Sequence, residues 1–431
     1  MKFGLLGRSL KHSKSKDIHK RMGDYSYDYI EAEPSEVESF IKDNDYDGFN
    51  VTIPYKRDAF SLCDHLSEIP QRTGSVNTVI YDGSISTGYN TDYYGFIYAC
   101  MRAGIKIKEK KVAILGSGGT SSTLKSALYD MGASSVTIFS RKGEITYESI
   151  KRDNERYKDI QVIINTTPVG MYPDNYNSVI DIEDFPGCEA VFDVIYNPLK
   201  TKLIRDAEKK GLIYTNGFPM LVAQAYYAKE ILFGNSNVIK GDFTIEINGE
   251  IEKIINEMSR ELVNIILIGM SGSGKSHNGR LVAKMTGRKF TDTDYEIVKS
   301  AKMDIAKIFQ KYGEEYFRDI ESEIIAEVGK STGTVISSGG GAVLREENVD
   351  NLRQNGILVW IFRDIDNLGQ EDIRKRPLLK DKDAALRLFE QRRHIYEKAS
   401  NFQVDNTGHD IITSKEIIQR SYDFSKEMIN G

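Results

Sequence analysis

Short apolar runs alternate with longer segments whose apolar residues recur at helical spacing along this chain. The runs Phe3–Leu6, Lys110–Leu115, Ser135–Phe139 and Ile265–Ile268 predict buried strands, and each leads into a turn before an amphipathic segment. Apolar runs bounded by turns are typical of strands, and their alternation with helices is typical of α/β proteins. The pattern therefore predicts an α/β protein with parallel sheets.

The segment between the two halves of the chain has a different pattern. Residues 243–249 predict a short strand and turn. Residues 250–261 then predict one amphipathic helix, because a single face carries Ile251, Ile254, Ile255 and Met258. Nothing in this segment resembles a flexible glycine- and serine-rich linker, so we expect a short and semi-rigid joint.

The segment N-I-I-L-I-G-M-S-G-S-G-K-S at residues 264–276 joins a predicted strand to a predicted helix. A G-x-x-x-x-G-K-S turn in this context indicates a phosphate-binding P-loop, whereas a chance glycine-rich turn is the alternative. Lys275 is expected to reach the β- and γ-phosphates of a nucleotide, and Ser276 is expected to hold Mg²⁺. Backbone N–H groups can turn towards the phosphates at three glycines, namely Gly269, Gly272 and Gly274.

Three strand ends in the first half carry polar side chains. Lys56 follows the strand N-V-T-I and a proline, Thr78 is expected to close a second strand, and Asp92 follows a third. Ligands of α/β proteins bind beyond the carboxyl ends of strands, and a Lys–Asp pair can pass a proton to a developing alkoxide. The alternative is a surface lysine and a helix-capping aspartate. Ser13 and Ser15 could bind a polyol or carboxylate, or could simply cap a helix.

A second turn, G-S-G-G-T after the strand that ends at Leu115, predicts a dinucleotide-binding site through Gly116, Gly118 and Gly119. The next strand ends in Ser140, Arg141 and Lys142. A basic side chain here suits the 2′-phosphate of NADP, where NAD-binding folds often carry an acidic residue. The alternative is a solvated pair of charges.

The second half repeats the pattern of polar groups after strands. Asp292 and Asp294 are expected at a strand end with both carboxylates on one face, where one serves Mg²⁺ and the other a substrate hydroxyl. A plain polar turn is the alternative. A later strand opens into Gly339, Gly340 and Gly341, which allow a ligand to approach the backbone closely.

Composition narrows the class of protein. The chain has 431 residues, 40% hydrophobic and 28% charged residues and a net charge of −5, which does not suggest nucleic acid or an anionic membrane as a partner. Its three cysteines have no metal-ligand spacing, no apolar run is long enough to span a membrane, and a strand follows Met1 too closely for a signal peptide. We therefore expect a cytoplasmic protein.

Motifs across residues 1–250 stand in a definite order, namely H-S-K-S, N-V-T-I-P-Y-K, G-S-V-N-T, G-Y-N-T-D-Y-Y-G, G-S-G-G, N-T-T-P-V-G-M, D-V-I-Y-N-P-L-K-T and N-G-F-P-M-L-V-A-Q-A. Together they resemble the shikimate dehydrogenase family. The resemblance implies that Lys56 and Asp92 are the catalytic pair and that NADP is the cofactor, although only Arg141 remains of the family's usual trio at the 2′-phosphate. It implies substrate contacts from Ser13, Ser15, Thr52, Asn77, Asn90, Tyr196 and Gln224.

Motifs from residue 262 onwards, namely G-x-x-x-x-G-K-S, D-T-D, F-R-D-I-E, G-G-G-A-V, R-P-L-L and R-x-x-x-Y, resemble the shikimate kinase family. The resemblance implies that Asp292 assists Ser276 at Mg²⁺ and that Asp294 holds the attacking hydroxyl and can take its proton. It implies that Arg376, in a mobile lid, neutralises phosphoryl charge together with Lys275. It implies that the substrate is bound by Arg318, Gly340 and Arg392. His277 stands where the family usually has threonine.

The two resemblances imply a bifunctional enzyme that reduces 3-dehydroshikimate with NADPH and then phosphorylates shikimate with Mg·ATP. The expected domains are a substrate domain (1–100 with 218–250), a Rossmann-like NADP domain (101–217), a joining helix (251–261) and a P-loop kinase domain with a parallel sheet (262–431). The partners expected are small molecules. Two alternatives are a shikimate-sensing regulator that has lost one or both activities and, for the first half, a catabolic quinate or shikimate dehydrogenase.

Overall fold

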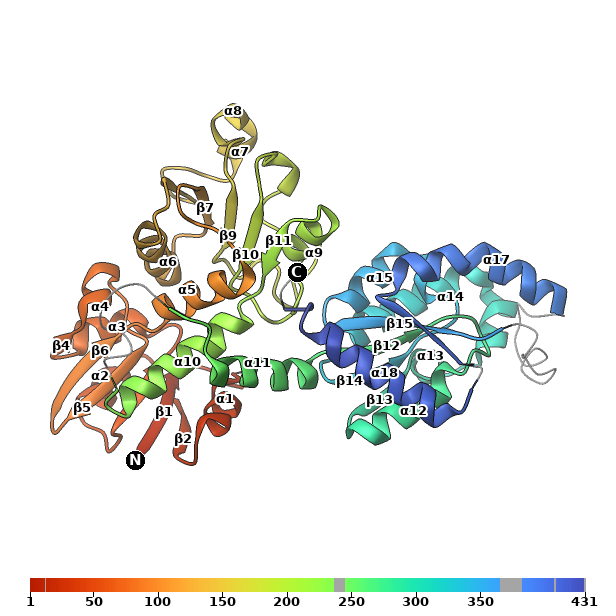
Figure 1. Cartoon of the computed structure of the whole chain (residues 1–431), viewed down its shortest axis with the longest axis horizontal. Coiled ribbons are helices and arrows are strands. Elements are labelled where there is room, and N and C mark those ends of the chain that lie inside the picture. The colour runs from red at the N-terminus through yellow and green to blue at the C-terminus, as the bar shows by residue number, and fades with distance from the viewer. Residues whose placement is uncertain (12, 236–244, 365–381, 407, 430–431) are drawn as a thin grey trace. The chain divides into compact units, whose positions relative to one another are not determined.

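The computed structural model of the chain describes residues 1–11, 13–235, 245–364, 382–406 and 408–429 (Figure 1). The described residues form two compact units. The first contains Met1–Tyr196 and Thr201–Ile255, and the second contains Asn197–Lys200 and Asn256–Ile429. The predicted α/β class is confirmed, because helices alternate with strands and two of the three sheets are wholly parallel.

The first sheet of the first unit is mixed, with the strand order β2-β1-β3-β5-β6-β4. Strands β1, β2 and β3 are parallel, whereas β5 runs antiparallel to β3 and β6. Its strands are β1 (Lys2–Gly7), β2 (Ser26–Glu31), β3 (Gly48–Val51), β4 (His65–Leu66), β5 (Thr78–Asp82) and β6 (Ile85–Tyr89). The helices of this part are α1 (Ser15–Met22), α2 (Val37–Lys42), α3 (Lys56–Leu62) and α4 (Glu68–Thr73).

The second sheet of this unit is parallel, with the order β11-β10-β9-β7-β8. Alternate residues of β7 face opposite layers: Val112 and Ile114 join one core cluster and Ala113 and Leu115 the other. The strands are β7 (Lys111–Leu115), β8 (Ser135–Phe139), β9 (Val162–Asn165), β10 (Ala190–Asp193) and β11 (Ile213–Thr215). The helices are α6 (Gly119–Asp130), α7 (Glu148–Arg152), α8 (Asn154–Tyr157), η1 (Ile182–Asp184) and α9 (Lys202–Lys209).

Two packed helices connect these sheets. Helix α5 (Asp92–Ala103) contacts β11 and α6, and helix α10 (Phe218–Leu232) contacts β3 and β5 (Figure 1). The helices approach closely at Gly95, where an added Cβ would lie 2.7 Å from the carbonyl oxygen of Met220 and 2.9 Å from Cβ of Gln224. Residues near the start of α5 are therefore held in a fixed position relative to α10.

The second unit has a parallel sheet in the order β13-β14-β12-β15-β16. Ile265 and Leu267 of β12 face one core cluster, and Ile266 and Ile268 face the other. The strands are β12 (Asn264–Ile268), β13 (Lys289–Asp292), β14 (Thr334–Ser337), β15 (Gly356–Phe362) and β16 (Phe402–Asp405). The helices are α12 (Lys275–Thr286), α13 (Thr293–Ala301), α14 (Ile305–Gly329), η3 (Ala342–Leu344), α15 (Glu346–Arg353), α17 (Lys382–Ala399) and α18 (Asp410–Ser425).

The segment before the second unit differs from its prediction. Residues 245–248, the described part of the expected strand, form no strand, and helix α11 (Gly249–Leu262) follows at once. The reason is local, because Asn248 Oδ1 accepts hydrogen bonds from the N–H groups of Glu250 and Ile251 and so begins the helix. The predicted apolar face of α11 is buried, as expected.

Within the described ranges, no helix has both the length and the apolar character that crossing a membrane requires.

The buried carboxyl of Asp193 predicts a pH-dependent stability. Burial raises the pKa of Asp193 to about 7, although Thr201, Asn165 and the N–H of Ile195 donate hydrogen bonds to it. In the unfolded chain an aspartate titrates near pH ~4. Between these values only the folded state holds the proton, so the free energy of unfolding falls as pH rises, by at most about 1.4 kcal/mol per pH unit.

Asp193→Asn is expected to remove this fall. Melting temperatures of the parent and the variant, measured across the interval between the two pKa values, would check it. An identical pH dependence in both proteins would contradict the assignment.

Candidate active sites

Two strand ends of the first sheet bring Lys56 and Asp92 together. Lys56 begins α3 after β3, Asp92 begins α5 after β6, and Lys56 Nζ donates to Asp92 Oδ2 at 2.5 Å. Their side chains are 18% and 11% exposed, so the pair is largely withdrawn from water yet accessible. The alternative, in which Lys56 is a surface lysine and Asp92 only caps a helix, does not agree with this pairing.

Asn77 organises the same pair. Its Nδ2 atom donates to Asp92 Oδ1 at 3.0 Å and lies 3.4 Å from Gln224 Oε1, while its Oδ1 atom accepts from the N–H of Thr91 at 2.7 Å. The expectation that Thr78 closes a strand is wrong, because Thr78 opens β5. Since β5 is antiparallel to β3, its first residue still lies beside the end of β3, and the polar groups meet as predicted.

The two serines lie at the same edge of the sheet. Ser13 follows β1 and Thr52 follows β3, and these strands are parallel neighbours. Ser13 Oγ donates to Ser15 Oγ at 3.2 Å, and the hydroxyl of Tyr29 donates to the carbonyl oxygen of Ser13. Tyr196 is half-buried and close enough to Tyr29 to interact with it electrostatically, and burial raises the pKa of Tyr196. These hydroxyls therefore gather around one end of β1 and β3.

Asn90, a predicted substrate contact, is deeply buried. It is 1% exposed, and its Nδ2 atom donates to the carbonyl oxygen of Ser75 and to Thr123 Oγ1, both at 3.0 Å. Because Thr123 is on α6, Asn90 links the end of β6 to the helix of the second sheet. Its amide nitrogen is bonded inside the protein, whereas its Oδ1 atom has no hydrogen-bond partner among the described residues.

The turn after β7 has the geometry of an anion site. Gly116 has φ of +107°, and an added Cβ would lie 2.7 Å from Thr166 Oγ1, so a side chain is excluded there. Helix α6 begins at Gly119, and its N-cap residue Gly118 provides no side-chain cap and has open space beside it. The first N–H groups of the helix therefore remain available for a phosphate, which fits the diphosphate of a dinucleotide.

The P-loop of the second unit also has backbone that only glycine readily adopts. The φ angles of Gly269, Gly272 and Gly274 are +136°, +88° and +94°. Lys275 Nζ donates to the carbonyl oxygens of Gly269 and Met270 at 2.8 Å, so the loop curls around the lysine. Ser276 Oγ donates to Asp292 Oδ2 at 2.6 Å. This hydroxyl and carboxylate are the hard oxygen donors that suit Mg²⁺.

The two aspartates are not arranged as predicted. Asp292 ends β13, but Asp294 lies in the first turn of α13 and not on the strand. The helix begins there because the Asp292 carboxylate accepts from the N–H groups of Asp294 and Tyr295. Asp292 thus faces Ser276, whereas Asp294 faces a separate cavity.

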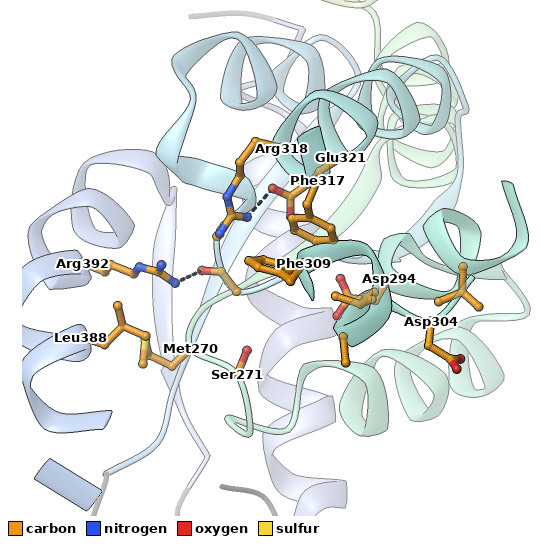
Figure 2. A pocket seen from close by; sticks show the side chains of 16 residues that line it. Met270, Ser271, Asp294, Asp304, Phe309, Phe317, Arg318, Glu321, Leu388 and Arg392 are labelled. Carbon is orange, nitrogen blue, oxygen red and sulfur yellow. Dashed lines mark hydrogen bonds and ion pairs between the residues drawn. The ribbon is translucent and has the colours of Figure 1, made fainter. Parts of the chain in front are cut away.

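That cavity has a volume of about 390 Å³ and is lined by residues of α13, α14, α17, the P-loop and the segment 339–341 (Figure 2). Asp294 reaches it from α13, Arg318 from α14 and Arg392 from α17, while Met270 and Ser271 of the P-loop line one side. Its remaining wall includes Phe309, Phe317 and the backbone of Gly339, Gly340 and Gly341. The cavity thus has two guanidinium groups, three carboxylates (Asp294, Asp304 and Glu321) and apolar walls. The guanidinium groups suit an acidic ligand, and the carboxylates can accept hydrogen bonds from its hydroxyl groups.

Gly340 lies directly against the P-loop. An added Cβ would lie 2.8 Å from Ser271 Oγ, and the carbonyl oxygen of Gly340 accepts from Arg392 Nη1 at 3.4 Å and from the hydroxyl of Tyr396. The predicted residues Asp294, Arg318, Gly340 and Arg392 are thus together at one cavity.

Comparison with known proteins agrees with both sites. The family model "Shikimate dehydrogenase substrate binding domain" matches residues 5–79, and "Shikimate kinase" matches residues 271–423. A shikimate dehydrogenase (NADP(+)) of Caldicellulosiruptor bescii is 39% identical over 280 residues, which cover 58% of this chain and 96% of that protein. The chain belongs to the shikimate dehydrogenase family. Residues 271–423 add a shikimate kinase domain to it.

Solved structures support the family. A chorismate mutase/shikimate 5-dehydrogenase fusion protein from Clostridium acetobutylicum is 30% identical, with a TM-score of 0.53, and covers 59% of this chain and 96% of its own. Shikimate 5-dehydrogenase from Thermus thermophilus, solved with NADP(H) and shikimate, is 27% identical, with a TM-score of 0.51 and coverage of 59% and 98%.

Two carboxylates that line the kinase cavity, Glu321 and Asp304, were not predicted from the sequence. Glu321 is 0% exposed and accepts from Arg318 Nη1 at 2.6 Å, and burial raises its pKa although Arg318 opposes the change. Its Oε1 atom has no hydrogen bond among the described residues. The spacing in F-R-D-I-E was a usable signal, because residues three apart share a helix face.

Two further predictions for the kinase domain concern Arg376 and His277. Arg376 and most of the predicted lid lie outside the described residues. His277 lies on α12, and its Nε2 atom is 3.0 Å from Asp410 Oδ2 of α18. Its side chain therefore contacts the neighbouring helix.

The shikimate dehydrogenase part predicts a cofactor preference through Arg141. This residue follows β8, is exposed and forms no ion pair with any described residue. A charge-assisted contact to the 2′-phosphate of NADP is worth roughly 1.5–3 kcal/mol. Arg141→Ala is therefore expected to lower kcat/KM with NADPH about ten- to a hundredfold and to leave the rate with NADH unchanged.

The control for this prediction is Lys142→Ala, which removes the neighbouring exposed charge. Initial rates with both cofactors would be compared. Equal efficiency with NADPH and NADH in the parent protein, or an unchanged Arg141→Ala variant, would disprove the role.

Proposed function

We propose that the chain catalyses two consecutive steps of aromatic amino-acid biosynthesis. The first unit reduces 3-dehydroshikimate to shikimate with NADPH, and the second phosphorylates the 3-hydroxyl of shikimate with Mg·ATP. The observation that carries the proposal is the presence of two sets of polar groups among the described residues, Lys56 with Asp92 and Asp294 with Arg318 and Lys275. The product of the first site is the substrate of the second.

In the reduction, NADPH supplies the hydride and the protein supplies a proton. Lys56 donates that proton to the carbonyl oxygen of the substrate, which becomes the new hydroxyl. Asp92 holds Lys56 at 2.5 Å, and Asn77 holds the other oxygen of Asp92. The serine, threonine and tyrosine hydroxyls at Ser13, Ser15, Thr52 and Tyr196, with Gln224, bind the carboxylate and ring hydroxyls. Asn90 Nδ2 also joins the end of β6 to Thr123 of α6, and its Oδ1 atom has no hydrogen-bond partner among the described residues.

In the phosphorylation, positioning and charge neutralisation do most of the work. Arg318 and Arg392 bind the substrate carboxylate, and Glu321 fixes the guanidinium of Arg318. Asp294 accepts the proton of the attacking hydroxyl. Ser276 and Asp292 would hold Mg²⁺, and the P-loop amides and Lys275 would bind the phosphates. Arg376, which the resemblance assigns to the lid, would add a positive charge.

The domain division that best fits this function is 1–100 with 218–250 for the substrate, 101–217 for NADP, 251–261 as the joining helix and 262–431 for the kinase. A cytoplasmic location is supported by the free thiols Cys63, Cys100 and Cys188. The proposed partners are small molecules alone. The regulator alternative gains no support from the described residues, because the chain retains Lys56, Asp92, Lys275 and Asp294. Arg141 disfavours an NAD-dependent catabolic dehydrogenase.

The proposal is tested by incubating the purified chain with 3-dehydroshikimate, NADPH and Mg·ATP. Formation of shikimate 3-phosphate, with NADPH oxidation that does not require ATP, is the expected result. NADPH oxidation without phosphorylation would remove the kinase step. Shikimate binding without either reaction would support the regulator.

A further inference from the structure

A row of buried polar side chains leads from β2 to the Lys56–Asp92 pair. The hydroxyl of Tyr27 donates to Asn50 Oδ1 at 2.8 Å, and Asn50 Nδ2 donates to Thr78 Oγ1 at 2.9 Å. Thr78 Oγ1 lies 3.1 Å from Asn77 Oδ1, and Asn77 Nδ2 lies 3.0 Å from Asp92 Oδ1. From Tyr27 to Asn77, each side chain is at most 6% exposed, so water does not compete for these bonds.

Backbone groups fix the orientation of both amides in this row. The N–H of Thr91 donates to Asn77 Oδ1, which leaves the NH₂ group of Asn77 facing Asp92. The carbonyl oxygen of Asn77 accepts from Asn50 Nδ2 at 3.3 Å, which leaves the oxygen of Asn50 facing Tyr27. Because Thr78 Oγ1 accepts from Asn50, its proton is available to Asn77 Oδ1. All the donors therefore point from Tyr27 towards Asp92.

A directed chain of this kind has a consequence for the reaction. If the amide of Asn77 turned over, its oxygen would face the carboxylate of Asp92, and Asp92 would lose the donor that steadies the oxygen opposite Lys56. A buried hydroxyl that donates to Asn77 Oδ1 opposes this turn, and buried polar networks of this kind specify one arrangement.

We propose that Tyr27, Asn50 and Thr78 are positioning residues of the dehydrogenase reaction, which hold the amide of Asn77 in the orientation that Asp92 requires. The inference rests on the proposed dehydrogenase function. We call the row of hydrogen bonds from Tyr27 through Asn50 and Thr78 to Asn77 the relay. Thr78 is the sharpest test position, because it is 0% exposed and its single hydroxyl joins the two amides.

The experiment compares Thr78→Val, which keeps the shape and removes the hydroxyl, with Thr78→Ser, which keeps the hydroxyl. Thr78→Val is expected to lower the dehydrogenase kcat about tenfold or more, as the loss of a buried hydrogen-bond partner implies. Thr78→Ser is expected to restore most of that loss. The shikimate kinase rate of the same preparation serves as the internal reference and is expected to stay constant.

Dependence on Asn77 is tested by repeating Thr78→Val in an Asn77→Ala background. The two residues form one pathway, so the second substitution is expected to add little. A full additional loss in that background would overturn the relay, since it would mean that Thr78 acts through packing alone. Equal kcat values for Thr78→Val and Thr78→Ser would overturn it as well.

Hydrogen exchange of the Asn77 side chain can be measured without enzyme turnover. It therefore tests the relay independently of the proposed function. In protein labelled with ¹⁵N-asparagine, the side-chain NH₂ signal of Asn77 is identified by its absence in Asn77→Ala. Its exchange with solvent is expected to be slow in the parent and Thr78→Ser and fast in Thr78→Val. Slow exchange in all three would overturn the relay. A parent protein without dehydrogenase turnover would refute the proposed function, while the exchange rates would still decide the relay.

Discussion

Replacing Lys56 with alanine is expected to abolish the reduction of 3-dehydroshikimate and to leave the phosphorylation of supplied shikimate nearly unchanged. Lys56 is the proton donor in the proposed reaction, and general acid catalysis contributes about a hundred- to ten-thousandfold. Its Nζ atom has a defined partner in Asp92 Oδ2 at 2.5 Å. Steady-state rates of both reactions on one preparation would measure the effect.

Two variants make this test specific. Lys42→Ala removes a lysine that pairs with Glu38 on the exposed face of α2, and such a pair contributes little. Lys56→Arg keeps the charge but replaces a compact ammonium by a planar fork, so activity is not expected to return. Dehydrogenase turnover that survives in Lys56→Ala would rule out the proposed acid.

Asp294→Ala is expected to do the reverse, with loss of phosphorylation and retention of NADPH-dependent reduction. Asp294 lines the cavity that Arg318 and Arg392 share, and it is the proposed acceptor of the hydroxyl proton. A decrease in kcat of about a hundred- to ten-thousandfold is expected, with a smaller change in KM for shikimate because the arginines remain.

Asp423→Ala, on the exposed side of α18, is the matched control in the same unit. Expression of residues 1–257 and 258–431 as separate chains would test independence further. If either the Lys56→Ala or the Asp294→Ala chain lost both activities, or if both fragments were inactive, the two chemistries would not be separable.

The P-loop and the dinucleotide turn were predictable from sequence because each depends on local rules. A β-branched run, glycines at fixed spacing and a following amphipathic segment suffice to place Gly269, Lys275 and Gly116. The Lys56–Asp92 pair was predictable for a different reason. Strands β3 and β6 both run antiparallel to β5, so they run in the same direction and their ends lie at one edge of the sheet.

Predictions failed where side chains compete with the expected backbone pattern. Asp292 and Asn248 each cap a helix, so α13 and α11 begin where a strand was expected to continue. The bond from Asn90 to Thr123, which lies 33 residues further along the chain, could not be predicted from local sequence. Glu321 was missed because its importance lies in its contact with Arg318, which spacing permits but does not require.

The close packing of α5 against α10 sets an unusual limit on variation. Position 95 has no functional group, yet a single added methyl would collide with Met220 and Gln224. Because Gln224 and Asp92 are on these two helices, the collision would reach the dehydrogenase site by moving backbone and not by removing chemistry. In a library that samples all amino acids at this position, glycine should be selected as strictly as lysine at position 56.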